Sequence, residues 1–224
     1  MMKFFMKLLV SRQIKIERGE FRLFNQNVTV IPITFLAELT KYYMSKTENK
    51  KQGLSDFYFM AWAMAYDFME RFSENYKIKT FEDRWTLGMD IVAMTGLGDY
   101  KTIKWEKGKL SHVYVENNPV AKYFYPSKAP IDYFYCGLTA GGAMIVHKLG
   151  ASNIFNCVET ECGAVNGKKC VFVSAVPKKH EEMGTWDAMQ SFIDIDYVLP
   201  KQIEFFKKYK QFRKGNNDVL FELI

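Results

Sequence analysis

The stretch PIDYFYCGLTAGGAMIVHKLG (residues 130–150), followed by ASNIFNCVETECGAVNGKKCVFV (residues 151–173), decides how the chain is organised. Its first half is predicted to be a helix, because Pro130 and Asp132 suit a first turn and Gly150 suits the position just past the last turn. Its second half is predicted to be a β-hairpin closed at Asn166-Gly167. One helix–hairpin unit would then gather three thiols and two carboxylates: Cys136, Cys157 or Cys162, Cys170, Glu159 and Glu161.

Cysteine spacing in this unit indicates a metal site. Zinc takes four N, S or O ligands in a tetrahedron, usually with two of them from a tight turn or hairpin. If the loop is residues 165–167 and Gly167 is left-handed, Cys162 lies opposite Cys170 on one face of the hairpin. A two-residue turn at Asn166-Gly167 would put the two thiols on opposite faces. The metal hypothesis therefore predicts the longer loop.

Spacing alone leaves the rest of the site open. Cys136 would come from the helix, and a carboxylate would complete the set of ligands. Spacing does not choose between Glu159 and Glu161, and it does not exclude Cys157. Buried free thiols and a disulfide are the alternatives to a metal.

Length and cysteine content narrow the class of protein. A chain of 224 residues fits one large domain, or a domain with an appendage, and can bury its core without cross-links. Four clustered cysteines favour metal binding in a reducing compartment, so we expect a cytoplasmic protein. The N-terminal MMKFFMKLLV is interpreted as a buried first strand instead of a signal peptide. No stretch reaches the roughly 18 uncharged apolar residues of a membrane-spanning helix.

The net charge of +6 comes from scattered lysines. A basic face attracts phosphate, but no nucleic-acid recognition motif accompanies these lysines, so we interpret them as a solvated surface. Aromatic residues make up 16% of the chain, which predicts a large apolar interior with room for a cavity.

Hairpins and helices are predicted to alternate before this unit. The expected hairpins span residues 12–24, with a turn at Arg18-Gly19, and residues 100–116, with a turn at Lys107-Gly108; Val28 and Val30 would add a short strand. The expected helices are residues 33–44 after Pro32, residues 55–76 with Ser55 as N-cap, and a helix capped by Thr80 with Asp83 that ends near Gly96 or Gly98. After Pro177, helical stretches at residues 186–195 and 200–212 are expected to form a tail that packs on the domain or on a partner subunit.

Three quoted runs resemble the 4-vinyl reductase domain family: VENNPVAKYFY (115–125), CGLTAGGAMIVHKLG (136–150) and VETECGAVNGKKCVFV (158–173). This family of small-molecule-binding domains includes the sensor halves of phenol-responsive transcription activators. Its signature is Glu-x-x-Cys, a short turn containing Gly, and a second Cys followed by an aromatic residue. The matching positions are Glu159, Cys162, Gly167, Cys170 and Phe172, and the resemblance covers about residues 80–176.

The resemblance implies a structural zinc ion bound by Cys136, Glu159, Cys162 and Cys170, with Cys157 as a non-ligand. It also implies an α+β fold, an antiparallel β-sheet packed with helices, similar to components of the transport-protein-particle tethering complex and often dimeric. We expect a ligand-binding domain over residues 1–177 and a C-terminal helical appendage over residues 178–224.

The expected function is the binding or sensing of a small hydrophobic or aromatic molecule by a zinc-containing homodimer. We expect neither nucleic acid nor a membrane as a partner. Alternatives are a reductase-like enzyme acting on a vinyl or aromatic substrate, and a dimeric scaffold without ligand. No nucleotide-binding fingerprint is present, and His112, His147 and His180 show no evident nucleophile to pair with. Candidate pocket residues are Trp85, Met89, Trp105, Tyr114, Phe124, Tyr133 and Phe134, although for each of them the pattern favours a plain core position.

Overall fold

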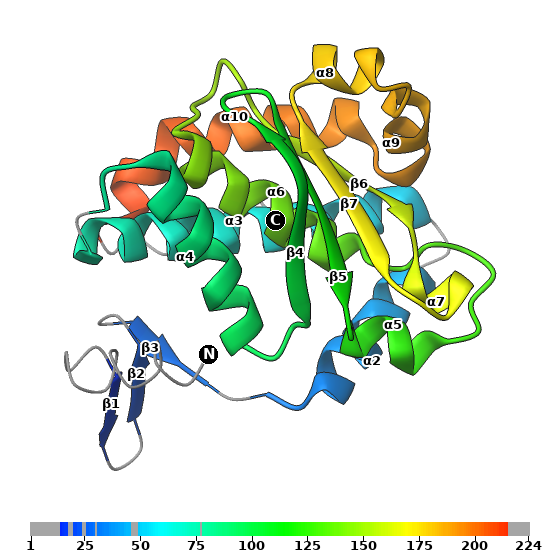
Figure 1. Ribbon diagram of the computed structural model, residues 1–224, viewed down its shortest axis with the longest axis horizontal. Coiled ribbons are helices and arrows are strands. Elements are labelled where there is room, and N and C mark those ends of the chain that lie inside the picture. The colour runs from blue at the N-terminus through cyan, green and yellow to red at the C-terminus, as the bar shows by residue number, and fades with distance from the viewer. Residues whose placement is uncertain are drawn as a thin grey trace.

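Four antiparallel strands form the central sheet (Figure 1). The computed structural model describes residues 14–17, 20–23, 26–29, 31–45, 49–76 and 78–214. The sheet has the order β4-β5-β7-β6, with β4 at Asp99–Glu106, β5 at Leu110–Glu116, β6 at Asn156–Glu161 and β7 at Cys170–Ala175. All six residues of the interior strand β7 are buried, as expected for a strand covered on both faces. The sheet and the helices around it confirm the expected α+β class.

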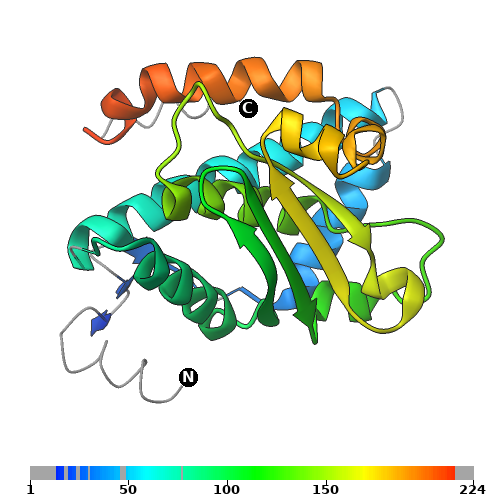
Figure 2. The same ribbon diagram turned by 45° about the horizontal axis from the view of Figure 1, so that its top comes forward.

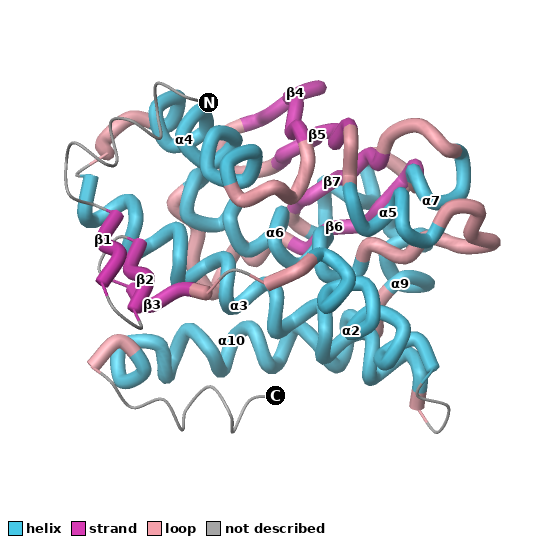
Figure 3. Tube along the Cα trace, turned by 90° about the horizontal axis from the view of Figure 1, so that it is seen from below, coloured by secondary structure: helices cyan, strands magenta, loops and turns pink. Residues whose placement is uncertain are grey.

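Helices stack beneath the sheet in successive layers (Figure 3). α6 (Tyr133–His147) packs on β6 and β7, and α3 (Lys50–Tyr76) packs on α6. α10 (Ile195–Phe212) runs along the far side of α3, as Figure 2 also shows. The other helices are α2 (Ile33–Ser45), α4 (Phe81–Met94), α5 (Pro119–Phe124), α7 (Gly163–Asn166), α8 (Pro177–Glu182) and α9 (Trp186–Phe192).

Small residues let α3 and α6 approach closely. A side chain at Gly137 would overlap the carbonyl oxygen of Tyr58, and one at Gly141 would overlap that of Trp62. α6 also packs on the sheet, so the close α3–α6 contact determines how near α3 lies to the sheet. It therefore positions the residues at the start of α6 relative to the β6–β7 hairpin.

The tail after Pro177 packs within the same chain. Phe205 of α10 lies edge-on to Trp62 of α3, with ring centroids 5.6 Å apart. Gln202 donates a hydrogen bond to Asn156 of β6 (3.0 Å), and the His180 Nε2 atom lies 2.9 Å from the Asn156 carbonyl oxygen. The tail thus contributes to the main core, while the domain boundary at residue 177 stays a prediction.

Several expected elements are confirmed. The hairpin β4–β5 forms, and the Thr80 hydroxyl accepts the Asp83 N–H as the cap of α4. A separate three-stranded sheet contains β1 (Ile14–Glu17), β2 (Glu20–Leu23) and β3 (Gln26–Val28). The strand expected at residues 1–10 lies outside the described residues.

Helix boundaries differ from the expectations where a cap was misjudged. α3 begins at Lys50, and the Ser55 hydroxyl bonds back to the Lys51 carbonyl inside the helix instead of capping it. α6 ends at His147, because left-handed Lys148 (φ 55°) closes it before Gly150. α10 begins at Ile195, where Asp194 caps Tyr197, and continues through Pro200.

The β6–β7 connection also differs from both hairpin loops considered. It contains the helical turn α7, followed by Gly167 in the left-handed region (φ 70°). Among the described residues, no helix is long and apolar enough to span a membrane.

Candidate metal centre

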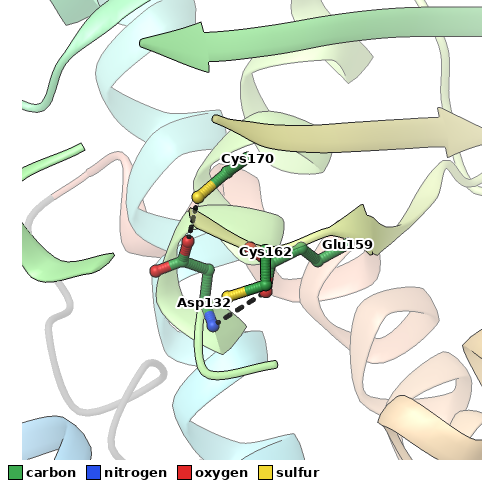
Figure 4. A group of neighbouring side chains, drawn as sticks. All are labelled: Asp132, Glu159, Cys162 and Cys170. Atoms are coloured by element: carbon green, nitrogen blue, oxygen red, sulfur yellow. Dashed lines mark hydrogen bonds between the residues drawn. The ribbon is translucent and has the colours of Figure 1, made fainter. Parts of the chain in front are cut away.

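The centre lies where the N-terminus of α6 meets the β6–β7 connection (Figure 4). Cys162 directly precedes α7, and Cys170 is the first residue of β7. Because α7 turns the chain back within a few residues, the two cysteines face the same space. The longer connection that the metal hypothesis needs is therefore present, although its geometry is helical.

Four potential metal ligands converge here. One ligand atom from each of Asp132, Glu159, Cys162 and Cys170 lies within 4.8 Å of the other three. All four residues are buried, with at most 4% of their surface exposed. Thiolate and carboxylate in such a compact group match the donors that zinc takes in proteins.

Hydrogen bonds use only part of the capacity of these carboxylates. The Asp132 Oδ2 atom accepts from the Asn118 amide (2.8 Å) and from the Cys170 thiol (3.0 Å), while the Glu159 Oε2 atom accepts the Asp132 N–H (3.3 Å). Asp132 Oδ1 and Glu159 Oε1 are buried without any hydrogen-bond partner. A buried carboxylate oxygen without a partner is costly, and a bound cation would remove this cost.

Electrostatics also favour a cation at this place. Burial raises the pKa of Asp132 to about 7 and raises the pKa of Glu159 well above its usual range. Hydrogen-bonding contact with Cys170 lowers the pKa of Cys162 to about 6, and the same contact raises the pKa of Cys170. Four acidic groups in one buried space cannot all ionise unless positive charge joins them. The residues present therefore fit a divalent metal ion.

Cys136 occupies a different position from the other expected ligands. Its N–H donates to the Asp132 carbonyl one turn earlier in α6 (2.8 Å). Burial, together with the nearby Cys157, raises the pKa of the Cys136 thiol. Both thiols are fully buried. The structure thus brings Glu159, Cys162 and Cys170 together and adds Asp132, which the sequence analysis assigned only to the helix start. Cys136 is not among the four residues of this group.

The expected pocket residues lie in several separate regions. Trp85 of α4 lies near Trp105 of β4 (6.5 Å between ring centroids) and donates to the Thr102 hydroxyl (2.8 Å). Tyr133 stacks on Phe192 of α9. The remaining positions are Met89 on α4, Phe134 against Phe57 of α3, Tyr114 beneath the Lys169 ammonium, and Phe124 on α5.

Two other buried phenol groups have no hydrogen-bond partner. The Tyr100 hydroxyl comes from β4 and the Tyr135 hydroxyl from α6, and both lie between the sheet and the helices. Burial raises the pKa of Tyr135, and the nearby Tyr100 raises it further.

His147 has a serine neighbour that the sequence did not reveal. Its Nε2 atom lies 2.8 Å from the Ser111 hydroxyl, while its Nδ1 atom accepts the Gly108 N–H (2.9 Å). Nδ1 is therefore unprotonated, and in the neutral ring Nε2 carries the hydrogen. Because Nε2 then donates to Ser111, His147 is not placed as a base that activates this serine.

Comparison with solved structures shows which fold this is. The phenol-responsive sensory domain of the transcription activator PoxR, solved with phenol, is similar with a TM-score of 0.66 at 13% identity, covering 82% of this chain and 93% of that chain. The chain therefore has the fold of that sensory domain, which agrees with the family resemblance in its sequence.

Two further solved structures are similar at lower scores. A trafficking protein particle complex subunit 3 from Naegleria fowleri, covalently bound to palmitic acid, has a TM-score of 0.46, 11% identity and coverages of 65% and 96%. A vinyl-4-reductase family protein from Methanocaldococcus jannaschii has a TM-score of 0.38, 18% identity and coverages of 66% and 83%. No protein-family model and no curated protein sequence matches the chain.

Proposed function

We propose that this chain is a small-molecule-binding domain of the sensory type, stabilised by a structural zinc ion. The observation that carries the zinc assignment is the pair of buried carboxylate oxygens without partners beside two thiols. Glu159, Cys162 and Cys170 supply three ligands. A fourth comes from the start of α6, which carries both Asp132 and Cys136.

The zinc is proposed to be structural because protein groups fill its coordination positions. Catalytic zinc keeps an open position for water, whereas four protein ligands close the tetrahedron. All the ligands are buried, so water has little access. The ion would tie α6 to β6 and β7, and its binding free energy would add to the stability of the fold.

The ligand is proposed to be a small hydrophobic or aromatic molecule with a polar group. The similar sensory domain responds to phenol, which supports this class of ligand. The unpartnered hydroxyls of Tyr100 and Tyr135 would bind the polar group between the sheet and α6. Of the expected pocket residues, Trp85 and Trp105 lie together and are the first to test as further contacts.

A homodimer in the cytoplasm completes the proposal. All four cysteines are free thiols in the structure, which suits a reducing compartment. The homodimer is proposed from the family resemblance.

Native mass spectrometry on protein purified without chelators tests the proposal. We expect a dimer with one zinc ion per chain and an added small organic mass. The Cys170→Ser variant should lose the zinc, whereas the matched Cys157→Ser variant should keep it. A metal-free wild-type chain would overturn the zinc assignment, and a chain that takes up no phenol or related aromatic molecule would favour the scaffold alternative.

A further inference from the structure

We infer that Asn118 is a positioning residue of the proposed zinc centre, holding the Cys170 sulfur and the Asp132 carboxylate through its amide nitrogen. This inference rests on the proposed function and adds a residue that binds no metal itself. It does not depend on how Asp132 and Cys136 share the start of α6. Asn118 lies directly before α5, outside both the helix and the hairpin that carry the ligands, so the sequence pattern did not mark it.

The oxygen end of the Asn118 amide is held by α5. Its Oδ1 atom accepts the N–H groups of Val120 and Ala121 (3.0 and 3.1 Å) and thereby caps this helix. An amide turned the other way round would point its NH₂ group at two N–H donors, so the capping bonds assign its orientation. The nitrogen of Asn118 therefore faces away from these two N–H groups.

The nitrogen end of the amide reaches two members of the candidate metal centre. It donates to Asp132 Oδ2 (2.8 Å) and to the Cys170 sulfur (3.4 Å). An amide side chain has two donor hydrogens and two acceptor sites, and Asn118 uses all four here. The residue is only 4% exposed, so water hardly competes for these bonds. A helix cap needs only the oxygen, so the two bonds of the nitrogen require a second explanation.

Hydrogen bonds to the Cys170 sulfur would persist when a metal binds. The thiol itself donates to Asp132 Oδ2 (3.0 Å, Figure 4), and this bond is lost when Cys170 binds a metal as thiolate. Two donors to the sulfur remain, the Asn118 amide and the Gly163 N–H (3.2 Å). Donors of this kind share the negative charge of a ligand and fix its direction toward the metal. Because the Gly163 donor is a backbone group, of these two only the Asn118 donor can be removed by substitution.

Two substitutions at Asn118 separate the amide nitrogen from the helix cap. Serine caps a helix as well as asparagine does but lacks the amide nitrogen, whereas alanine lacks both groups. We expect Asn118→Ser and Asn118→Ala to lose zinc affinity by a similar factor, about 10- to 100-fold, as variants of the outer partners of metal ligands do. Asn118→Ala should lower the melting temperature of the metal-free protein further than Asn118→Ser, because α5 loses its cap. Chelator competition and thermal unfolding measure the two effects.

Lys122→Ala is the matched control on α5. Its exposed side chain bonds to the Asn117 side chain (2.8 Å), so this variant should keep the zinc affinity of the wild type. Wild-type zinc affinity in Asn118→Ser, with folding checked by circular dichroism, would show that Asn118 serves only as a cap and would overturn the inference.

Cobalt gives a second readout that a purely structural role would not move. Thiolate-bound Co²⁺ has a charge-transfer absorption whose energy falls when a hydrogen bond to the sulfur is lost, because the sulfur then gives up an electron more easily. The band should therefore lie at longer wavelength in Asn118→Ser than in the wild type and in Lys122→Ala. An unchanged band in Asn118→Ser would overturn the inference while leaving the zinc centre standing. A wild type that binds neither zinc nor cobalt would instead overturn the proposed function, and this inference with it.

Discussion

His147 shows how one buried side chain makes stability depend on pH. Its ring is 4% exposed and lies between the aromatic rings of Phe81 and Phe155. Burial, with a smaller contribution from the nearby Arg84, lowers its pKa to about 4. The bonds to Gly108 and Ser111 suit the neutral ring. Protonation therefore opposes folding.

We expect stability to fall as the pH drops from about 6.5 toward 4. In this window the unfolded chain binds a proton at His147 and the folded chain does not, so each step down in pH favours unfolding. The full effect is about 3 kcal/mol by pH 4. Urea unfolding of the wild type and His147→Gln across this range measures it. The variant should show a shallower pH dependence by about one proton, and equal slopes in the two proteins would contradict the prediction.

At the residue scale, the sequence predicted part of the candidate metal centre. The spacing of Glu159, Cys162 and Cys170 follows the chain locally, so the resemblance could place all three, and the structure brings them together. Asp132 could not be recognised as a potential ligand. Its sequence position indicates a helix start, and only the tertiary contact with Asn118 and Cys170 shows that its side chain does not cap.

At the scale of elements, the packing of α3 against α6 depends on glycines in α6, which have no side chain. The carbonyl of Trp62 lies where a Cβ atom on Gly141 would stand, whereas the neighbouring Gly142 has only a Met69 side-chain carbon at 3.8 Å. Two adjacent glycines in one helix thus differ completely in the space around them. Glycine is unfavourable in a helix by up to about 1 kcal/mol relative to alanine. The close contact with Trp62 explains why glycine stands at position 141, whereas the space around Gly142 gives no such reason.

Gly141→Ala should therefore destabilise the protein by about 3 kcal/mol or more, because the added methyl group pushes α3 away from α6. Gly142→Ala serves as the control and should be neutral or slightly stabilising. Thermal unfolding of both variants measures the difference, with a drop of about 6–12 °C expected for Gly141→Ala. Similar melting temperatures for the two variants would mean that the interface adapts more easily than its geometry indicates.

Element types were predictable where local patterns decide them, and boundaries were not. Alternating residues about Lys107-Gly108 predicted β4–β5, since the hairpin pattern is contained in the strands themselves. The start of α10 was missed because Pro200 resembles a helix start, whereas Asp194 provides the cap one turn earlier. α7 was missed because only four residues form it, which is too few for a helical pattern, and because the two flanking strands determine the path of this connection.

Across the whole molecule, α10 joins the tail both to α3 and to the central sheet. Phe205 is 2% exposed and contacts the rings of Trp62 and Tyr66. Gln202 donates a hydrogen bond to Asn156 of β6, three residues before Glu159 on the same strand. If residues 178–224 were a loosely attached appendage, loss of these contacts would affect the tail alone. If they complete the core, the loss would spread to the β6–β7 hairpin.

Phe205→Ala distinguishes these two arrangements. Removing a buried phenylalanine side chain costs about 3–5 kcal/mol, and in a single cooperative core this loss lowers the protection of every element equally. Hydrogen exchange should therefore become faster in β6 and β7 as well as in α10. Lys207→Ala changes a mostly exposed side chain on the same helix. It should leave the opening free energies measured by hydrogen exchange within about 0.5 kcal/mol of those of the wild type. Faster exchange confined to α10 would instead show that the tail unfolds by itself, and the boundary expected at residue 177 would then mark a real division of the chain.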